Sequence, residues 1–218
     1  MNVKLISCSQ NKRRGHQSNS GKIASVIKSI MAANEMVNEV DTVYLSDYSL
    51  SPCTLCGGCS RSHRCVNDAS FNNLLEELKN TDLFLPIVPY YSPIPSSLSI
   101  VLEKFNQVLV TSHLAKNPLS EDYKQKKIGL IVHGGMVDSK PVRQHYEQMI
   151  AKPLASVFQG FGLEFLTNHT YSYGLCFGLE NESAVTEKVD ELFPLIDHRV
   201  EYVKETVKDY VKFLESLI

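Results

Sequence analysis

The 218-residue sequence contains no tryptophan, no long apolar run and no large excess of charge of either sign. No apolar run approaches the roughly 20 residues that a membrane-spanning helix needs, and the apolar stretch at the N-terminus is too short for a signal peptide. The formal net charge of −2 does not indicate general affinity for nucleic acids. We therefore expect a cytoplasmic protein with neither a membrane nor a nucleic acid as partner.

Two common nucleotide-binding motifs are also missing. The chain has neither the G-x-x-x-x-G-K-[ST] pattern of a P-loop nor the G-x-G-x-x-G pattern of a dinucleotide-binding loop. Hydrophobic residues nevertheless make up 43% of the chain, which is enough for a sizeable core. The length fits one α/β domain with additions and is short for two domains.

Cysteine is concentrated in one short segment, residues 53–65, which holds four of the six cysteines with the spacing C-x2-C-x2-C-x5-C. These are Cys53, Cys56, Cys59 and Cys65. Gly57 and Gly58 let the backbone bend closely around a common centre, and such a run is typical of an iron–sulfur cluster. Three alternatives stay open. A zinc site usually draws on two well-separated ligand pairs, disulfides need an oxidising compartment, and the thiols could be reduced and without a ligand.

Apolar runs that predict strands alternate with apolar residues at i, i+3, i+4 and i+7, which predict helices. The predicted strands cover residues 3–8, 40–44, 83–88, 128–132 and 163–169, with an irregularity at Pro86 because a central strand needs every N–H group. Five β-α units predict a three-layer α/β fold with a parallel sheet. We assign residues 1–181 to this domain and residues 182–218 to a C-terminal helical extension, and we assign no element to residues 170–181.

Three loops follow the first, third and fourth predicted strands. Loop 9–20 ends in Ser-Asn-Ser at a helix start, where hydroxyl and N–H groups cap the helix or hold a phosphate. Loop 89–97 begins with two tyrosines that can stack on a flat ring or cover the sheet edge. Loop 133–136 has two glycines, which let backbone approach a ligand. In the strand order 2-1-3-4-5 these loops meet at one crevice, which suits a mononucleotide with a flat ring.

On these motifs the sequence resembles the NAD(P)H-dependent FMN reductase group of flavodoxin-like proteins, and within it the iron–sulfur flavoproteins. Segment 9–20 is similar to the family's phosphate loop, and segment 89–98 is similar to the P-x-Y-x-G-x-x-S-x-x-L-K segment beside the isoalloxazine, with Ser92 in place of its glycine. Gly134 and Gly135 match the glycine loop at the pyrimidine edge of the ring. The cysteine run matches the motif that holds a [4Fe–4S] cluster.

The resemblance implies an FMN-dependent oxidoreductase, with NAD(P)H as a candidate electron donor and a small molecule or protein as redox partner. It also implies a [4Fe–4S] cluster on the four loop cysteines and a homodimer or homotetramer. The implied cofactor-binding residues are Ser9, Asn11, Ser18, Asn19, Ser20, Pro89, Tyr90, Tyr91, Ser92, Gly134, Gly135 and Met136. No side chain is assigned a catalytic role, and we interpret His133 as structural. The rival hypotheses are a cluster-free FMN, quinone or azo reductase and a non-enzymatic redox sensor or zinc-stabilised binding protein.

Overall fold

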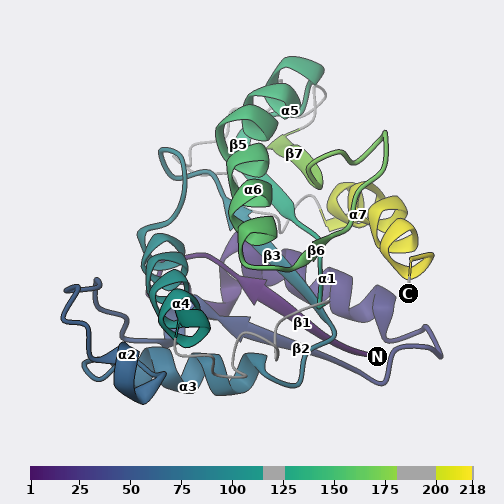
Figure 1. Cartoon of the computed structure of the whole chain (residues 1–218). Coiled ribbons are helices and arrows are strands. Elements are labelled where there is room, and N and C mark those ends of the chain that lie inside the picture. The colour runs from purple at the N-terminus through teal and green to yellow at the C-terminus, as the bar shows by residue number, and fades with distance from the viewer. Residues whose placement is uncertain (115–125, 181–199, 218) are drawn as a thin grey trace.

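The computed structural model describes residues 1–114, 126–180 and 200–217, and within them it has one parallel sheet with helices on both faces (Figure 1). Its strands are β1 (Asn2–Ser7), β2 (Glu39–Tyr44), β3 (Leu83–Pro89), β4 (Lys127–Ile128), β5 (Ile131–Val137), β6 (Glu164–Phe165) and β7 (Leu175–Glu180). The spatial order is β2-β1-β3-β4-β6, and β5 pairs with both β3 and β7. The parallel α/β architecture is confirmed. The sheet has seven strands instead of the five predicted, because the position beside β3 is divided between β4 and β5, and the next position is divided between β6 and β7.

The division of the fourth strand occurs beside Pro86. β3 pairs with β4 through Leu83 and Phe84 and then with β5 from Ile87 onward, so the ladder is interrupted next to the proline. At the gap, the Leu130 N–H donates to the Tyr210 hydroxyl at 2.9 Å. The irregularity expected at Pro86 is therefore present on the neighbouring strand, since proline has no N–H to contribute to a ladder.

The fifth strand position differs most from the prediction. Only Glu164–Phe165 of the predicted strand 163–169 is a strand, whereas residues 175–180, to which we assigned no element, form β7. β7 is buried along almost its whole length and pairs with β5. A continuous apolar run of this kind has no alternation of polar and apolar residues, so periodicity alone does not identify it.

The helices form the two outer layers of the domain. They are α1 (Asn19–Met31), α2 (Cys59–Ser62), α3 (Ala69–Leu78), α4 (Ser96–Leu114), α5 (Lys140–Tyr146), α6 (Lys152–Gly160) and α7 (Val200–Glu215), with 3₁₀ turns η1 (Gly15–Gln17) and η2 (Leu45–Asp47). The sequence predicts a helix from Pro141 that Pro153 should kink, and a π-helical turn, η4 (Glu147–Ala151), ends two residues before Pro153. Side chains of α1 and α7 share one core cluster, and those of α3, α4 and α6 share the other. The expected three layers are thus present.

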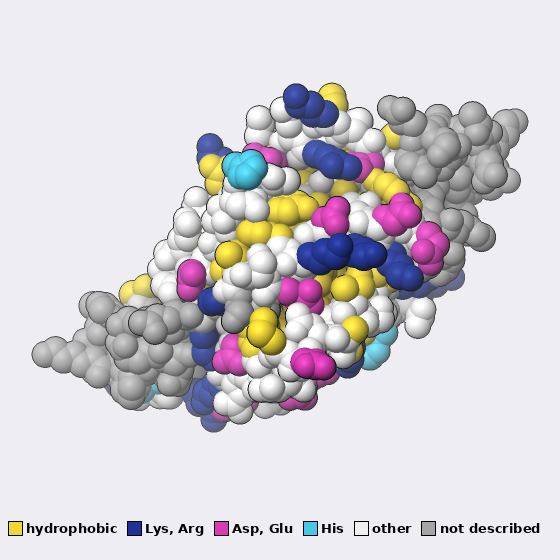
Figure 2. Space-filling view, turned by 90° about the vertical axis from the view of Figure 1, so that its right-hand side faces the viewer, with side chains coloured by type: hydrophobic (Ala, Val, Ile, Leu, Met, Phe, Trp, Pro, Cys, Tyr) yellow, Lys and Arg dark blue, Asp and Glu magenta, His cyan; other side chains and the backbone are white. Residues whose placement is uncertain are grey.

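The C-terminal helix belongs to the core of the domain. Val203, Val207, Tyr210, Val211 and Leu214 of α7 are fully buried, as their spacing predicts. For the preceding part of the extension, the sequence predicts a helix with an apolar face at Ala184, Val185, Val189 and Leu192 that ends at Pro194. These positions lie outside the described residues. In the described part of the face shown in Figure 2, basic and acidic side chains are interspersed. Within the described residues, no helix combines the length and apolar character needed to cross a membrane.

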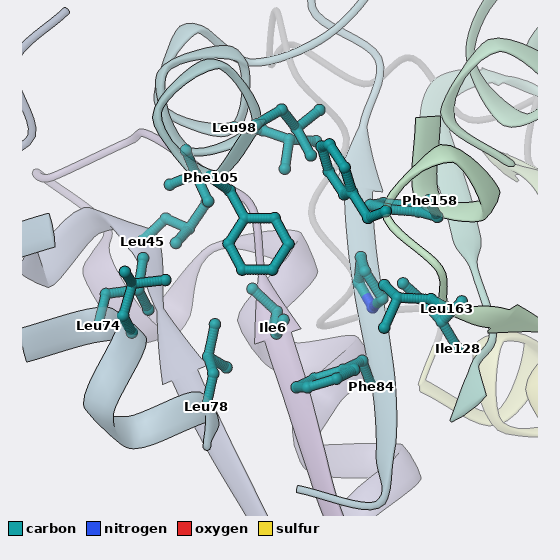
Figure 3. A pocket seen from close by; sticks show the side chains of 15 residues that line it. Ile6, Leu45, Leu74, Leu78, Phe84, Leu98, Phe105, Ile128, Phe158 and Leu163 are labelled. Carbon is teal, nitrogen blue, oxygen red and sulfur yellow. The ribbon is translucent and has the colours of Figure 1, made fainter. Parts of the chain in front are cut away.

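An apolar cavity of about 70 Å³ lies against the sheet beneath α3, α4 and α6 (Figure 3). Leu78, Phe84, Phe105 and Phe158 are among the side chains that line it, and all of its lining residues are hydrophobic. Because no polar side chain lines this cavity, it has none that could orient a phosphate or a flavin ring. The candidate site therefore lies elsewhere, at the polar edge of the sheet.

Candidate functional site

A cavity of about 760 Å³, called the crevice below, lies at the carboxyl ends of β1, β3 and β5. Its lining residues are Ser9, Asn11, Arg13, Arg14, Ser18, Asn19, Ser20, Pro89, Tyr90, Tyr91, His133, Gly134, Gly135, Met136 and Leu179. It brings together every predicted cofactor-binding residue except Ser92. Ser92 has a left-handed φ of 51°, a backbone conformation that favours glycine.

The first part of this crevice is the N-terminus of α1. Ser18 is the N-cap, and its side chain accepts a hydrogen bond from the Gly21 N–H at 3.3 Å, which confirms the predicted cap. Ser9, Ser18 and Ser20 are buried, with 3%, 3% and 1% of their surfaces exposed. Buried hydroxyls beside the free N–H groups of a helix start favour an anion. This end of the crevice fits a phosphate group.

The second part is the tyrosine pair after β3. The Tyr90 ring lies 5.5 Å from the ring of His145 and 5.4 Å from that of Tyr146, so part of its surface is used in packing against α5. Tyr91 is 40% exposed. The sequence left open whether the tyrosines cover the sheet edge or stack on a flat ring, and the two side chains differ in this respect. Tyr90 covers the end of the sheet as well as lining the crevice, and Tyr91 has free surface for a flat ligand.

The third part is the glycine loop at the end of β5. A Cβ added to Gly134 would lie 2.1 Å from the Tyr146 hydroxyl, so this position has no room for a side chain. Gly135 and Met136 are exposed at the crevice. Glycine at position 134 is therefore required by the packing of Tyr146, whereas Gly135 presents backbone without a side chain to the crevice.

Asp138 holds the far end of the glycine loop, a role that the sequence analysis missed. Its carboxylate accepts hydrogen bonds from Arg143 Nε at 2.8 Å, from the Gly178 N–H at 3.1 Å and from the Tyr202 hydroxyl. Burial raises the pKa of Asp138, but the hydrogen bonds outweigh it, and the pKa lies below its ordinary value. The ionised carboxylate therefore connects the end of β5 to β7 and α7. Gly178 and Tyr202 lie 40 and 64 residues from Asp138 in the sequence, so no local pattern indicated these two contacts.

His133 lies at the base of the crevice. It is 2% exposed, and its Nε2 is 2.9 Å from the Ser20 Oγ. Burial lowers the pKa of His133 to about 3, because the cationic ring is costly to bury. The ring is therefore neutral at physiological pH. The contact with Ser20 was not predicted.

The four loop cysteines border a separate cavity of about 380 Å³, which shares no lining residue with the crevice at the carboxyl ends of β1, β3 and β5. Lys104 of α4 also lines it. The four thiols suit iron or zinc chemically, but among the described residues no three His, Cys, Asp or Glu side chains come close enough to hold a metal ion. All six cysteines are free thiols. The loop thus gathers the four cysteines around one cavity without converging on a common centre.

The thiols differ in their surroundings. Cys56 is exposed, and its pKa is lowered by hydrogen bonds from the Gly58 N–H and the Thr54 hydroxyl. Cys8 and Cys176 are buried, and burial raises the pKa of each thiol to about 12. The sequence predicts packed small side chains at these two positions in preference to ligands, and both are buried. Of these three thiols, the exposed Cys56 is therefore the one suited to react.

A buried ion pair anchors the cysteine loop at both ends. Lys104 Nζ and the Asp68 carboxylate are in contact, and each side chain is only 2% exposed. Asp68 also accepts from the Ser51 N–H at 3.0 Å. The sequence predicts Asp68 as the cap of the helix that follows it, and its side chain accepts from the Phe71 N–H of α3 at 2.8 Å. Ser51 precedes the loop and Asp68 follows it, so α4 fixes both ends. Lys104 lies 36 residues from Asp68, which is why sequence reasoning missed it.

The chain was compared with known proteins. No protein-family model matches it. An iron–sulfur flavoprotein from Methanosarcina thermophila is 29% identical over 89 residues, which cover 41% of this chain and 44% of that protein. The match therefore spans less than half of the curated relative.

Solved structures match over almost the whole chain. A flavone reductase has a TM-score of 0.59 at 15% identity, covering 100% of this chain and 64% of its own. The structure of RosB with a bound riboflavin-phosphate intermediate has a TM-score of 0.65 at 14% identity, covering 97% of this chain and 76% of its own. An FMN-dependent NADH-azoreductase from Bacillus anthracis, in complex with FMN, has a TM-score of 0.58 at 11% identity, covering 98% and 99%. The chain therefore has the flavodoxin-like α/β fold, which it shares with flavin-dependent reductases.

Proposed function

We propose that this chain is a flavin-dependent oxidoreductase that binds FMN in the crevice at the carboxyl ends of β1, β3 and β5 and takes electrons from NAD(P)H. The observation that carries the proposal is the single cavity that joins a helix N-terminus with buried hydroxyls, a tyrosine pair and a glycine loop. These are the parts that a phosphate, a flat ring and its polar edge require. An FMN complex of a similarly folded azoreductase supports this proposal.

Each part of the crevice has its own role in this proposal. Ser9, Ser18, Asn19 and Ser20 bind the phosphate through hydroxyl and N–H groups, and the α1 dipole favours its charge. Tyr90 and Tyr91 border the ring. The backbone of Gly134–Met136 donates to the ring's carbonyl edge, where negative charge develops on reduction. FMN, when bound, supplies the redox chemistry, so no side chain of the chain has to transfer a proton.

An anaerobic absorption spectrum tests this proposal. The protein is mixed with FMN, freed of unbound flavin and treated with NADH or NADPH. We expect retained flavin absorbance that bleaches on addition of the reduced nicotinamide. A protein that retains no FMN contradicts the proposal and favours the non-enzymatic sensor or zinc-stabilised protein. Ser18→Ala should weaken FMN binding, whereas the matched control Ser29→Ala, whose hydroxyl bonds the Val26 carbonyl in the same helix, should not.

We also propose that the cysteine loop of this flavin-dependent oxidoreductase binds an iron–sulfur cluster. Two observations support it: the four thiols border one cavity, and the partial relative is an iron–sulfur flavoprotein. The thiols do not converge in this structure, so cluster uptake requires the loop to rearrange. Iron and acid-labile sulfide are measured after anaerobic reconstitution, with Cys59→Ser as the variant and buried Cys176→Ala as the control. Absence of both elements from a protein that still reduces FMN supports the cluster-free reductase instead.

A further inference from the structure

His133 and Ser20 form a hydrogen bond, and the surroundings of the histidine ring indicate which of the two residues is the donor. His133 lies on β5 and Ser20 lies in the first turn of α1, and the distance from Nε2 to Oγ is 2.9 Å. Both side chains are almost fully buried, and both line the crevice. The ring is neutral, so one nitrogen carries the hydrogen and the other has only a lone pair. Which nitrogen carries it decides whether Ser20 accepts or donates.

The other ring nitrogen distinguishes the two tautomers. His133 Nδ1 is buried and has no hydrogen-bond partner among the described residues. With the hydrogen on Nδ1, a buried N–H would be left unsatisfied, which is rare in proteins and costly. With the hydrogen on Nε2, the N–H donates to Ser20 and Nδ1 keeps only a lone pair. The structure therefore favours the Nε2–H tautomer.

This tautomer leaves the Ser20 hydroxyl with a free hydrogen. Its oxygen accepts from His133, so its own O–H can donate into the crevice that Ser20 lines. At this point the α1 N-terminus favours negative charge. A serine that instead donated to the ring would present only an oxygen to an anion.

We propose that His133 is a positioning residue, which donates from Nε2 to Ser20 and thereby directs the Ser20 hydroxyl as a donor to the phosphate of the ligand. This inference rests on the proposed FMN site and deepens it. His133 itself does not touch the phosphate and acts through Ser20. The role does not require the histidine to change its charge.

The tautomer is tested first, without any ligand. Protein with ¹⁵N-labelled histidine is examined by long-range ¹H–¹⁵N NMR, and the His133 signals are assigned by their absence in His133→Gln. We expect the hydrogen on Nε2. A hydrogen on Nδ1 overturns the inference and leaves the FMN proposal untouched.

The consequence for binding is tested with FMN and riboflavin, which differ by the phosphate. Ser20→Ala should weaken FMN binding by about tenfold to a hundredfold, as expected for the loss of one hydrogen bond to a charged group. Riboflavin binding should change by less than about twofold, since it lacks that group. The matched control is Ser25→Ala in the same helix, whose hydroxyl bonds the Gly21 carbonyl, and it should leave both affinities unchanged.

Variants of His133 separate positioning from packing. His133→Phe removes the donor and should weaken FMN but not riboflavin, whereas His133→Gln keeps an N–H donor and should recover most of the loss. Combined with Ser20→Ala, His133→Phe should add no further loss. Equal weakening of FMN and riboflavin, or additive losses, overturns the positioning role. If the wild-type protein binds neither flavin, the FMN proposal fails, and the NMR result still decides the tautomer.

Discussion

The buried pair of Lys104 and Asp68 allows the sharpest test of how the cysteine loop is held. Lys104→Met keeps most of the aliphatic volume and removes the ammonium group, with its charge and its hydrogen bonds to Asp68 and to the Ser51 hydroxyl. Asp68 then remains as a buried carboxylate without its cation, and breaking such a pair costs about 3–5 kcal/mol. Asp68 keeps the N–H donors of Ser51 and Phe71, so we expect the lower end, about 3 kcal/mol. For a chain of this size that corresponds to a fall in Tm of roughly 6–12 °C.

The pH dependence gives the prediction a second signature. In the wild-type protein, burial raises the pKa of Asp68, but hydrogen bonds from Lys104 and from the Ser51 and Phe71 backbone outweigh it, and the pKa is lowered. A lowered pKa stabilises the fold above the unfolded value of about 3.9, and this contribution is lost as the pH falls through the folded pKa. Lys104→Met removes the main interaction that lowers the pKa of Asp68, so burial then raises this pKa. The stability difference between the two proteins should therefore be largest near neutral pH and shrink toward pH 3.

Urea unfolding followed by circular dichroism at pH 7, 5 and 3.5 measures these differences. The double variant Lys104→Met/Asp68→Asn removes both charges and keeps a cap for α3, so it should recover much of the lost stability. The matched control is Lys204→Met, which breaks an exposed pair with Glu201 at 3.9 Å and should cost less than about 0.5 kcal/mol. A loss below about 1 kcal/mol for Lys104→Met, or a double variant less stable than the single one, refutes the reasoning.

Three further predictions concern the sheet and the crevice. Tyr210→Phe leaves the Leu130 N–H buried without its acceptor and should lower the free energy of unfolding in urea by about 1–3 kcal/mol. Gly134→Ala places a Cβ 2.1 Å from a tyrosine hydroxyl, and the resulting shift of the loop should weaken FMN binding at least about tenfold in a fluorescence titration. Burial raises the pKa of Asp138, but its hydrogen bonds, of which the one from Arg143 has the largest effect, lower the pKa below its ordinary value. Its contribution to stability is therefore lost as the pH falls below about 4, and Asp138→Asn should flatten the loss of stability in urea between pH 5 and pH 3.

Each of these variants has a matched control. Tyr171→Phe changes a tyrosine whose ring contacts that of Tyr210 and should cost less than Tyr210→Phe. Gly160→Ala adds a Cβ with nothing within 4 Å and should not change FMN binding. Asp209→Asn removes a carboxylate that is 78% exposed and should leave the pH profile unchanged. A variant that behaves like its control would contradict the corresponding prediction.

Helices α1, α3, α4, α5 and α7 and the first three strands could be predicted because local patterns specify them, whereas the short α2 inside the cysteine loop was not predicted. The apolar face of α3 has helical spacing, and Phe71, Leu74, Leu75 and Leu78 are all buried. Ser18 and Asp68 were expected as caps from residue type and position alone, and both side chains accept the capping hydrogen bond. The divided fourth strand could not be foreseen, because its gap is satisfied by Tyr210, which lies 80 residues further along the chain.

By itself, the sequence determined the alternation of strands and helices, the three loops at one edge of the sheet and the four cysteines in one loop. These follow from periodicity, turn residues and spacing, which act over a few neighbouring residues. Only the tertiary structure decided that β7 extends the sheet, that Lys104 lies against Asp68 and that His133 reaches Ser20. Those contacts join side chains 36 to 113 residues apart. Their partners are chosen by the packing of the layers, which no local pattern records.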